Sequence, residues 1–159
     1  MRTPLHKASY NGHIAAIQLL IDHRADVNAK DKWGTTPLHK ASWNGHTNAA
    51  QLLINHGANV NERNKYGWTP LHCASLNGHT NAVKLLIDHG ANINKRTDNG
   101  EAPLHKASCM GHIGAMKLLI DHGADVNAKG YKEWTPIHCA SHYGHTNAMK
   151  LLKSYGATK

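Results

Sequence analysis

The string Thr-Pro-Leu-His begins at Thr3, Thr36 and Thr69, and it returns as Ala-Pro-Leu-His at Ala102 and as Thr-Pro-Ile-His at Thr135. Each copy follows the last by 33 residues, with no insertion or deletion between copies. A fixed period of this length indicates stacked structural repeats, in which each unit buries its apolar face against its neighbours. We therefore expect residues 1–159 to form a single elongated domain of five units. The units span residues 1–30, 31–63, 64–96, 97–129 and 130–159.

The second unit shows how one repeat is expected to fold. Thr36 and Pro37 open a first helix, because a threonine side chain caps free N–H groups and proline suits the first helical position. Gly45 ends this helix, and Thr47 is expected to cap a second one. Gly57 ends the second helix, since glycine readily adopts the left-handed conformation found there. The polar stretch that follows predicts a projecting hairpin-like turn.

The period and the Thr-Pro-Leu-His-x-Ala core resemble the ankyrin repeat, and the resemblance covers the whole chain. It implies an all-α fold, a solenoid of stacked helix-turn-helix units with short projecting hairpin loops. It also implies a non-catalytic scaffold that binds a protein partner through the concave face formed by hairpin tips and inner helices. A natural fragment and an engineered ankyrin binder both fit this pattern.

Fourteen of the fifteen histidines fall at three repeated places, and His142 is the exception. A metal site is one interpretation, because histidine is a common metal ligand. A structural role explains their number better, since an imidazole can donate and accept hydrogen bonds at once and so join neighbouring units. The family uses the histidine of its Pro-Leu-His motif in this way. We expect no metal or other cofactor, and the chain contains no Walker loop, dinucleotide fingerprint or His-Glu-x-x-His motif.

Two short windows differ in every copy, one around the hairpin glycine and one before the Gly-His pair. All four tryptophans and four of the five tyrosines lie in these windows. Tryptophan and tyrosine are enriched among binding hot spots, although hairpin aromatics can also pack on one another and stiffen the array. The candidate partner-binding residues are Tyr10, Lys32, Trp33, Lys40, Trp43, Lys65, Tyr66, Trp68, Leu76, Met110, Trp134 and Tyr143. We place the energetic centre at Trp33, Trp43, Tyr66 and Trp68.

The formal charge of +8 and the pI of about 9.5 favour an acidic partner. Basic residues recur at two places, which stacking would turn into two ladders. The first ladder is Lys30, Arg63, Arg96 and Lys129, and the second is Lys7, Lys40 and Lys106. These ladders either keep the array soluble or steer a partner. Nucleic acid or another polyanion on this basic face is the alternative function, but no nucleic-acid motif supports it and three acidic residues near one end oppose it.

The three cysteines indicate a reducing compartment. Cys73 and Cys139 hold equivalent places two units apart, so roughly 16–20 Å of helix packing separates them and they cannot form a disulfide. An unpaired set is typical of intracellular proteins. The chain has neither an apolar signal segment at its start nor a stretch long enough to span a membrane. We expect a cytoplasmic or nuclear monomer.

Two departures from the repeat predict local changes. Arg24 stands where the other units have a glycine, and a side chain in a left-handed conformation costs roughly 1 kcal/mol. Glu133 replaces the hairpin glycine of the last unit, with Gly130 shortly before it. We therefore expect the last hairpin tip to differ in shape from the others.

Overall fold

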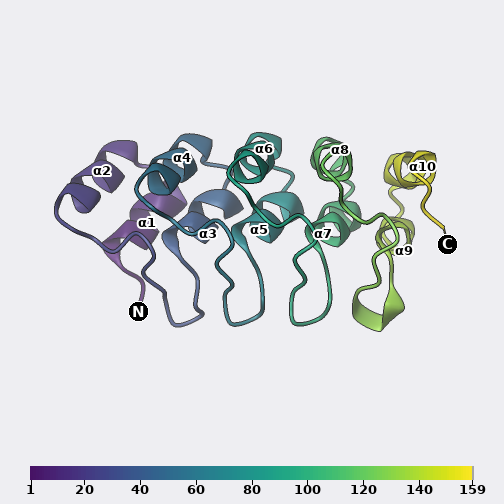
Figure 1. Cartoon of the computed structure of the whole chain (residues 1–159), viewed down its shortest axis with the longest axis horizontal. Helices are drawn as coiled ribbons and strands as arrows, with labels where there is room; N and C mark the ends of the chain where they lie inside the picture. The colour runs from purple at the N-terminus through teal and green to yellow at the C-terminus, as the bar shows by residue number, and fades with distance from the viewer. Residues whose placement is uncertain (159) are drawn as a thin grey trace.

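The computed structural model describes residues 1–158, and within that range it contains ten α-helices, one short 3-10 helix and no strand. The α-helices are α1 (Pro4–Asn11), α2 (Ile14–Asp22), α3 (Pro37–Trp43), α4 (Thr47–Asn55), α5 (Pro70–Leu76), α6 (Thr80–Asp88), α7 (Pro103–Met110), α8 (Ile113–Asp121), α9 (Pro136–His142) and α10 (Thr146–Ser154), and the 3-10 helix is η1 (Tyr131–Glu133). Figure 1 shows the odd-numbered helices in one row, the even-numbered helices in a second row, and the termini at opposite ends. Loops project from the row of odd-numbered helices, so the predicted all-α solenoid is confirmed. No helix within residues 1–158 has the length and apolar character needed to cross a membrane.

In the second unit, the first helix begins as predicted. At α3, the Thr36 side chain accepts a hydrogen bond from the His39 backbone N–H, and Pro37 occupies the first helical position. The prediction that Thr47 caps the second helix is wrong. The N-cap of α4 is His46, and the Thr47 hydroxyl lies within the first turn, where it donates to the Gly45 carbonyl at 3.5 Å.

Aliphatic side chains fill the core between the two helix rows. Leu38, Leu53, Leu71 and Leu86 are fully buried, and alanines occupy most of the remaining buried apolar positions. Small residues let helices of adjacent units approach closely, while the leucines provide most of the buried apolar area. No tryptophan or tyrosine is needed to fill this core, so the aromatic residues remain available to the surface.

The histidines of the Thr-Pro-Leu-His motif join each unit to the next loop. Their Nε2 atoms lie 2.7–3.1 Å from backbone carbonyl oxygens that are 29 residues further along the chain. The four pairs are His6 with Thr35, His39 with Trp68, His72 with Glu101, and His105 with Trp134. The structural role expected for this set is confirmed for these four histidines, each of which precedes a further unit.

The histidines of the Gly-His pairs connect units in the opposite direction. Nε2 of His46, His79, His112 and His145 lies 3.0 Å from a carbonyl oxygen 36 residues earlier. Each of these rings lies against the glycine of the preceding unit. A Cβ atom added to Gly78, for example, would lie 2.5 Å from Nδ1 of His112. The ring therefore requires a residue without a side chain at that place.

Asparagines form a third link between units, at the start of the projecting loops. The Asn61 side-chain amide donates to the Gly90 carbonyl at 3.0 Å, and its oxygen accepts from the Asn92 backbone N–H at 2.7 Å. Asn28, Asn94 and Asn127 each bond the next unit in the same way. Because one side chain satisfies a donor and an acceptor of its neighbour, these asparagines fix the spacing of the loops.

Arg24 adopts the left-handed conformation expected from the repeat, with φ of 63°. Replacing Arg24 with glycine should raise the free energy of unfolding by about 0.5–1 kcal/mol, because glycine has no Cβ to strain there. The converse change, Gly57→Ala, places a Cβ at the equivalent site with nothing within 4 Å and should lower it by a similar amount. Urea denaturation of both variants measures these changes in the free energy of unfolding. If both substitutions raised it, or both lowered it, this account would be contradicted.

The last loop differs from the others, as Glu133 predicted. Tips of the earlier loops join through backbone bonds, from Lys65 N–H to the Trp33 carbonyl at 2.9 Å and from Asp98 N–H to the Tyr66 carbonyl at 3.1 Å. In the last unit the tip is η1, where Lys132 and Glu133 both have positive φ. Two adjacent non-glycine residues in that conformation turn the chain without the hairpin shape of the earlier tips.

Candidate binding face

Four aromatic side chains of the second and third units come together on one face. Trp33 and Tyr66 are neighbours at adjacent loop tips, with ring centroids 6.3 Å apart. Trp43 at the end of α3 lies beside Trp68, again with centroids 6.3 Å apart. Trp33, Trp43 and Tyr66 remain 40–54% exposed, whereas Trp68 is half-buried. The proposed energetic centre therefore consists of two ring pairs that line the same cavity. The Trp33–Tyr66 contact also fits the alternative that loop tips stiffen one another.

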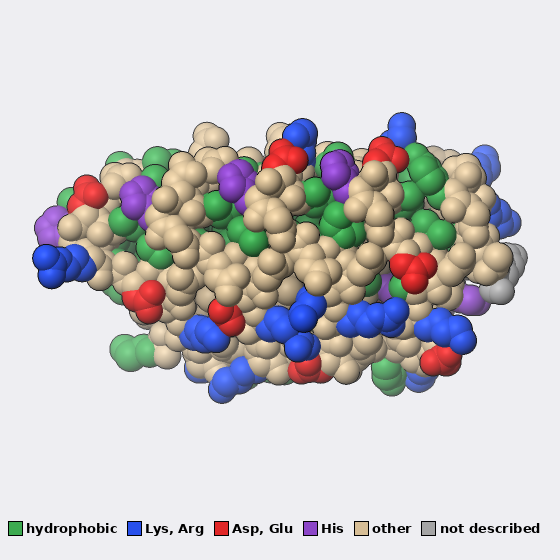
Figure 2. All heavy atoms as spheres, in the orientation of Figure 1, with side chains coloured by type: hydrophobic (Ala, Val, Ile, Leu, Met, Phe, Trp, Pro, Cys, Tyr) green, Lys and Arg blue, Asp and Glu red, His purple; other side chains and the backbone are tan. Residues whose placement is uncertain are grey.

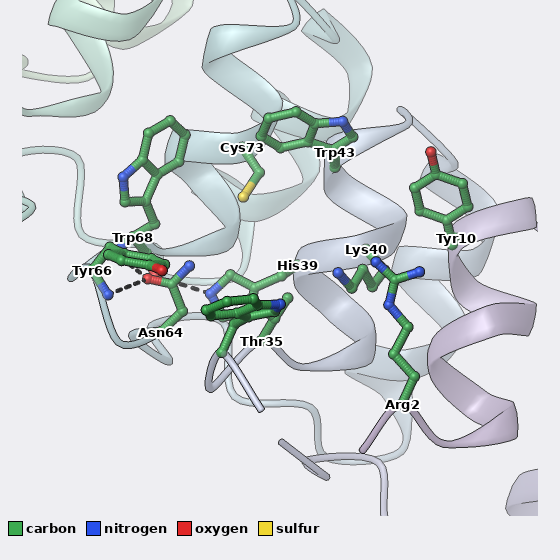
Figure 3. A pocket seen from close by; sticks show the side chains of 11 residues that line it. Arg2, Tyr10, Thr35, His39, Lys40, Trp43, Asn64, Tyr66, Trp68 and Cys73 are labelled. Atoms are coloured by element: carbon green, nitrogen blue, oxygen red, sulfur yellow. Dashed lines mark hydrogen bonds between the residues drawn. The ribbon is translucent and has the colours of Figure 1, made fainter. Parts of the chain in front are cut away.

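These rings form the walls of a cavity of about 590 Å³ that is open to solvent (Figure 3). The odd-numbered helices α1, α3 and α5 contribute Tyr10, Lys40, Trp43 and Cys73. The loops contribute Trp33, Tyr66 and Trp68. A largely apolar hollow with a few polar groups is typical of a binding site. Here helices and loops form separate walls, and the lining residues come from the first three units.

Hydrogen bonds from backbone N–H groups to the side chains of Asp31 and Asn64 hold the loop tips in position. The Asp31 carboxylate accepts hydrogen bonds from the backbone N–H groups of Trp33 and Thr35, at 2.9 and 3.0 Å. Asn64 does the same for Tyr66 and Trp68, at the same distances. A side chain that closes the turn in this way orients the aromatic residues through their backbone N–H groups, and the aromatic rings take no part in these bonds.

Lys40 lines the cavity beside Asp31, with Nζ 3.5 Å from Oδ2. Desolvation raises the pKa of Asp31, but backbone hydrogen bonds from Thr35 and Trp33 together with the charge of Lys40 outweigh it and leave that pKa below its usual value. Asp31 is thus ionised, and the Lys40 side chain is only 15% exposed. Its ammonium group is fixed in place at the edge of the aromatic walls.

Other lysines lie against the aromatic rings. Lys106 Nζ lies 4.6 Å from the centroid of Trp68, and Lys32 Nζ lies at the same distance from Trp33. Both distances are within the range of a cation–π interaction. Lys65 is exposed and makes no ion pair with any residue from 1 to 158.

Family models described as ankyrin repeats match this sequence over most of its length. One, described as three copies, matches residues 1–64 and 57–130, and another, described as many copies, matches residues 110–152. The chain belongs to the ankyrin repeat family. Ankyrin repeats are in general protein–protein interaction modules, and ankyrin proteins are typically non-catalytic. The comparison with curated proteins finds no match.

The remaining candidate residues of this ankyrin array lie outside the cavity. Leu76 is half-buried, and Met110 is 51% exposed at the end of α7. Trp134 and Tyr143 form a second aromatic cluster in the last unit through His142, whose ring centroid is 4.9 Å from each. Neither Trp134 nor Tyr143 lines the main cavity.

Sequence reasoning missed Arg2, which lines the cavity, and the contact between two of the cysteines. Burial raises the pKa of the Cys73 thiol to about 12, so it stays protonated. Cys109 on α7 lies near Cys139 on α9, and interaction with the Cys139 thiol lowers the pKa of the Cys109 thiol. Cys109 occupies a different place in its repeat from the equivalent residues Cys73 and Cys139. Cys109 and Cys139 are 30 residues apart, three fewer than the repeat period, and this spacing is the signal in the sequence that could have indicated their proximity.

Basic side chains gather in a row along the loops on the face seen in Figure 2. Most of the first basic ladder is already paired within the array. Lys30 with Glu62, Arg63 with Asp98, and Lys129 with Glu133 form ion pairs of 2.8–2.9 Å. Arg96 donates to the Lys129 carbonyl. Pairing with carboxylates lowers the positive charge that this ladder offers to a polyanion.

The part of the chain that the structure describes holds no group of three histidine, cysteine or acidic side chains placed to bind a metal ion. The third histidine set is engaged with its own helices. His56 Nδ1, for example, lies 2.9 Å from the Leu52 carbonyl oxygen, and His23, His89 and His122 repeat this arrangement.

Proposed function

We propose that this ankyrin array is a non-catalytic binding module that holds a protein partner on its concave face, centred on the cavity between the second and third units. The observation that carries the proposal is the set of large, partly exposed rings that wall this cavity. Trp33, Trp43 and Tyr66 each keep 40% or more of their surface exposed. Exposed aromatic groups of this size are typical of surfaces that bury them in a complex.

The rigidity of the site supports the same proposal. Buried Asp31 and half-buried Asn64 hold the loop tips, and helix α3 carries Trp43. Aromatic side chains on fixed elements lose little conformational freedom on binding, so more of their buried area contributes to affinity. Candidate residues outside the cavity, such as Met110 and Tyr143, would extend the contact toward the last unit.

Binding of nucleic acid remains the alternative, and the internal ion pairs of the first basic ladder weigh against it. The partner-binding site would then lie along the loops rather than in the aromatic cavity. The two proposals therefore predict different dependence on the aromatic residues and on salt.

Replacing both Trp43 and Tyr66 with alanine should abolish capture of the partner from a cell lysate. Trp43 lies on the helix wall of the cavity and Tyr66 on the loop wall. Both residues are exposed, so the fold should be retained. Loss of a hot-spot aromatic costs about 2 kcal/mol or more, which is roughly thirtyfold in affinity. Affinity capture followed by mass spectrometry measures the loss, and circular dichroism verifies the fold.

The matched control is Leu19→Ala/Tyr155→Ala, which removes apolar side chains that are 59% and 40% exposed away from the cavity. The control should capture the same partner as the original chain. Equal capture by the Trp43/Tyr66 variant would contradict the proposal. Capture that disappears after nuclease treatment would support nucleic-acid binding instead.

A further inference from the structure

A second cavity, of about 550 Å³, adjoins the aromatic one at the first unit. Both cavities are lined by Arg2, Tyr10 and Lys40, and the second is also lined by Lys7. Figure 3 shows Arg2 and Lys40 extending toward the same part of the site, beside Tyr10. No acidic side chain of residues 1–158 lines either cavity. An aromatic hollow therefore continues directly into a cationic one.

The charge at this junction is not balanced within the array. Lys40 is paired with Asp31, but neither Arg2 nor Lys7 pairs with a carboxylate of the described residues. The junction thus carries two uncompensated positive charges beside low-dielectric aromatic walls. Such a place attracts an anionic group and strengthens its interaction relative to open solvent.

The equivalent place further along the array is different. Lys106, which corresponds to Lys40, pairs with Glu101 at 2.5 Å and also lies over Trp68. Asp98 and Glu133, on the loops of the last two units, pair with Arg63 and Lys129. Of the cationic side chains that line the two cavities, only Arg2 and Lys7 of the first unit have no carboxylate partner among residues 1–158.

We propose that this junction is a carboxylate subsite, which binds an Asp or Glu side chain of the partner while a nearby large apolar side chain of the same segment enters the aromatic cavity. The inference rests on the proposed function and specifies its partner as an acidic peptide segment. A guanidinium group matches the two oxygens of a carboxylate through paired N–H donors. A doubly charged phosphate suits the place less well, because ionised Asp31 lies next to Lys40 and repels the additional charge.

Short random peptides displayed on phage and selected on the whole chain test the proposal. The peptides recovered should carry Asp or Glu close to an aromatic or large aliphatic residue. Exchanging that acidic residue for its amide should weaken a synthetic peptide about tenfold, as for loss of a hydrogen bond to a charged group. Fluorescence anisotropy measures the affinity.

The variant Arg2→Ala/Lys7→Ala should weaken the acidic peptide by the same factor and leave the amide peptide unchanged. Both side chains are exposed, so their removal should not disturb the fold, whereas replacing Lys40 would leave buried Asp31 unpaired. The control Lys117→Ala/Lys150→Ala removes the same charge from exposed positions on α8 and α10, and it should have little effect.

The possible failures are distinguishable. Peptides that need Trp43 and Tyr66 but show no preference for acidic residues would overturn the subsite and leave the proposed function standing. Peptides that bind the Trp43→Ala/Tyr66→Ala variant as well as the original chain, or no enrichment at all, would overturn both. Binding of an oligothymidylate that is lost in the Arg2/Lys7 variant would assign the junction to polyanions and overturn the carboxylate assignment.

Discussion

Lowering the pH from about 7 to about 5 should remove about 4 kcal/mol from the free energy of unfolding, about 2 kcal/mol from each of His39 and His72. Burial lowers the pKa of both imidazoles from 6.5 to about 4. The unfolded chain therefore takes up protons first as the pH falls. The contribution of these groups is fully present above pH 6.5, declines between 6.5 and about 4, and levels off below that. Burial lowers the pKa of His6 and His105 as well, which adds to the loss in the same direction.

Hydrogen bonding determines which ring nitrogen carries the proton, and burial opposes the addition of a second proton. Nδ1 of His39 accepts the backbone N–H of Thr36 at 3.1 Å, so Nε2 carries the proton and donates to the Trp68 carbonyl. A second proton on Nδ1 would point at that N–H group and leave an unpaired buried charge. His72 makes the same two contacts, with Thr69 and Glu101.

Urea denaturation at a series of pH values measures the effect, and histidine NMR resonances provide an independent test. The resonances of His39 and His72 should remain those of the neutral form down to about pH 5. Titration of either ring near 6.5, or a free energy of unfolding that does not change between pH 7 and 5, would contradict the prediction. Substituting both residues with glutamine should flatten the pH dependence, even if it lowers stability throughout.

Gly78→Ala should lower the free energy of unfolding by about 3 kcal/mol, and Gly144→Ala by only about 1 kcal/mol. The two glycines have similar left-handed conformations, with φ of 68° and 74°. A methyl group at Gly78 would collide with the His112 ring, whereas nothing lies within 4 Å of one placed at Gly144. The difference therefore isolates the contact between units from the backbone strain that both substitutions share.

Displacing the ring also removes its bond to the Leu76 carbonyl, which is 3.0 Å long. Thermal and urea denaturation compare the two variants on the same scale. Equal losses would show that the histidine ring moves aside at little cost. Combining Gly78→Ala with His112→Ala should then recover much of the additional loss, because the collision disappears with the ring.

The fold and the role of most histidines could be predicted because repetition exposes them in the sequence. A residue such as His39 occurs at the same place in all five units, and its bond to the next unit follows from one recurring geometry. Arg24 and Glu133 were informative for the same reason, since each departs from a place whose conformation the other units define.

The candidate site was predictable only in part, because it depends on residues that do not repeat. Trp33, Trp43, Tyr66 and Trp68 stood out as variable aromatics, and the structure brings them together. Arg2 lies outside both variable windows, so its place beside Lys40 depends on the path of the chain before α1. The Cys109–Cys139 contact joins two different repeat places, which a comparison of equivalent positions does not pair.

The bonds between units have one further consequence, for the speed of folding. The histidine and asparagine links join residues 29, 31 or 36 apart in the sequence, whichever units they connect. Adding units lengthens the chain without lengthening these spans, so relative contact order falls as the array grows. Folding rates decrease as relative contact order rises, so a longer array is not expected to fold more slowly for this reason. Folding can also begin at any two adjacent units and spread to their neighbours.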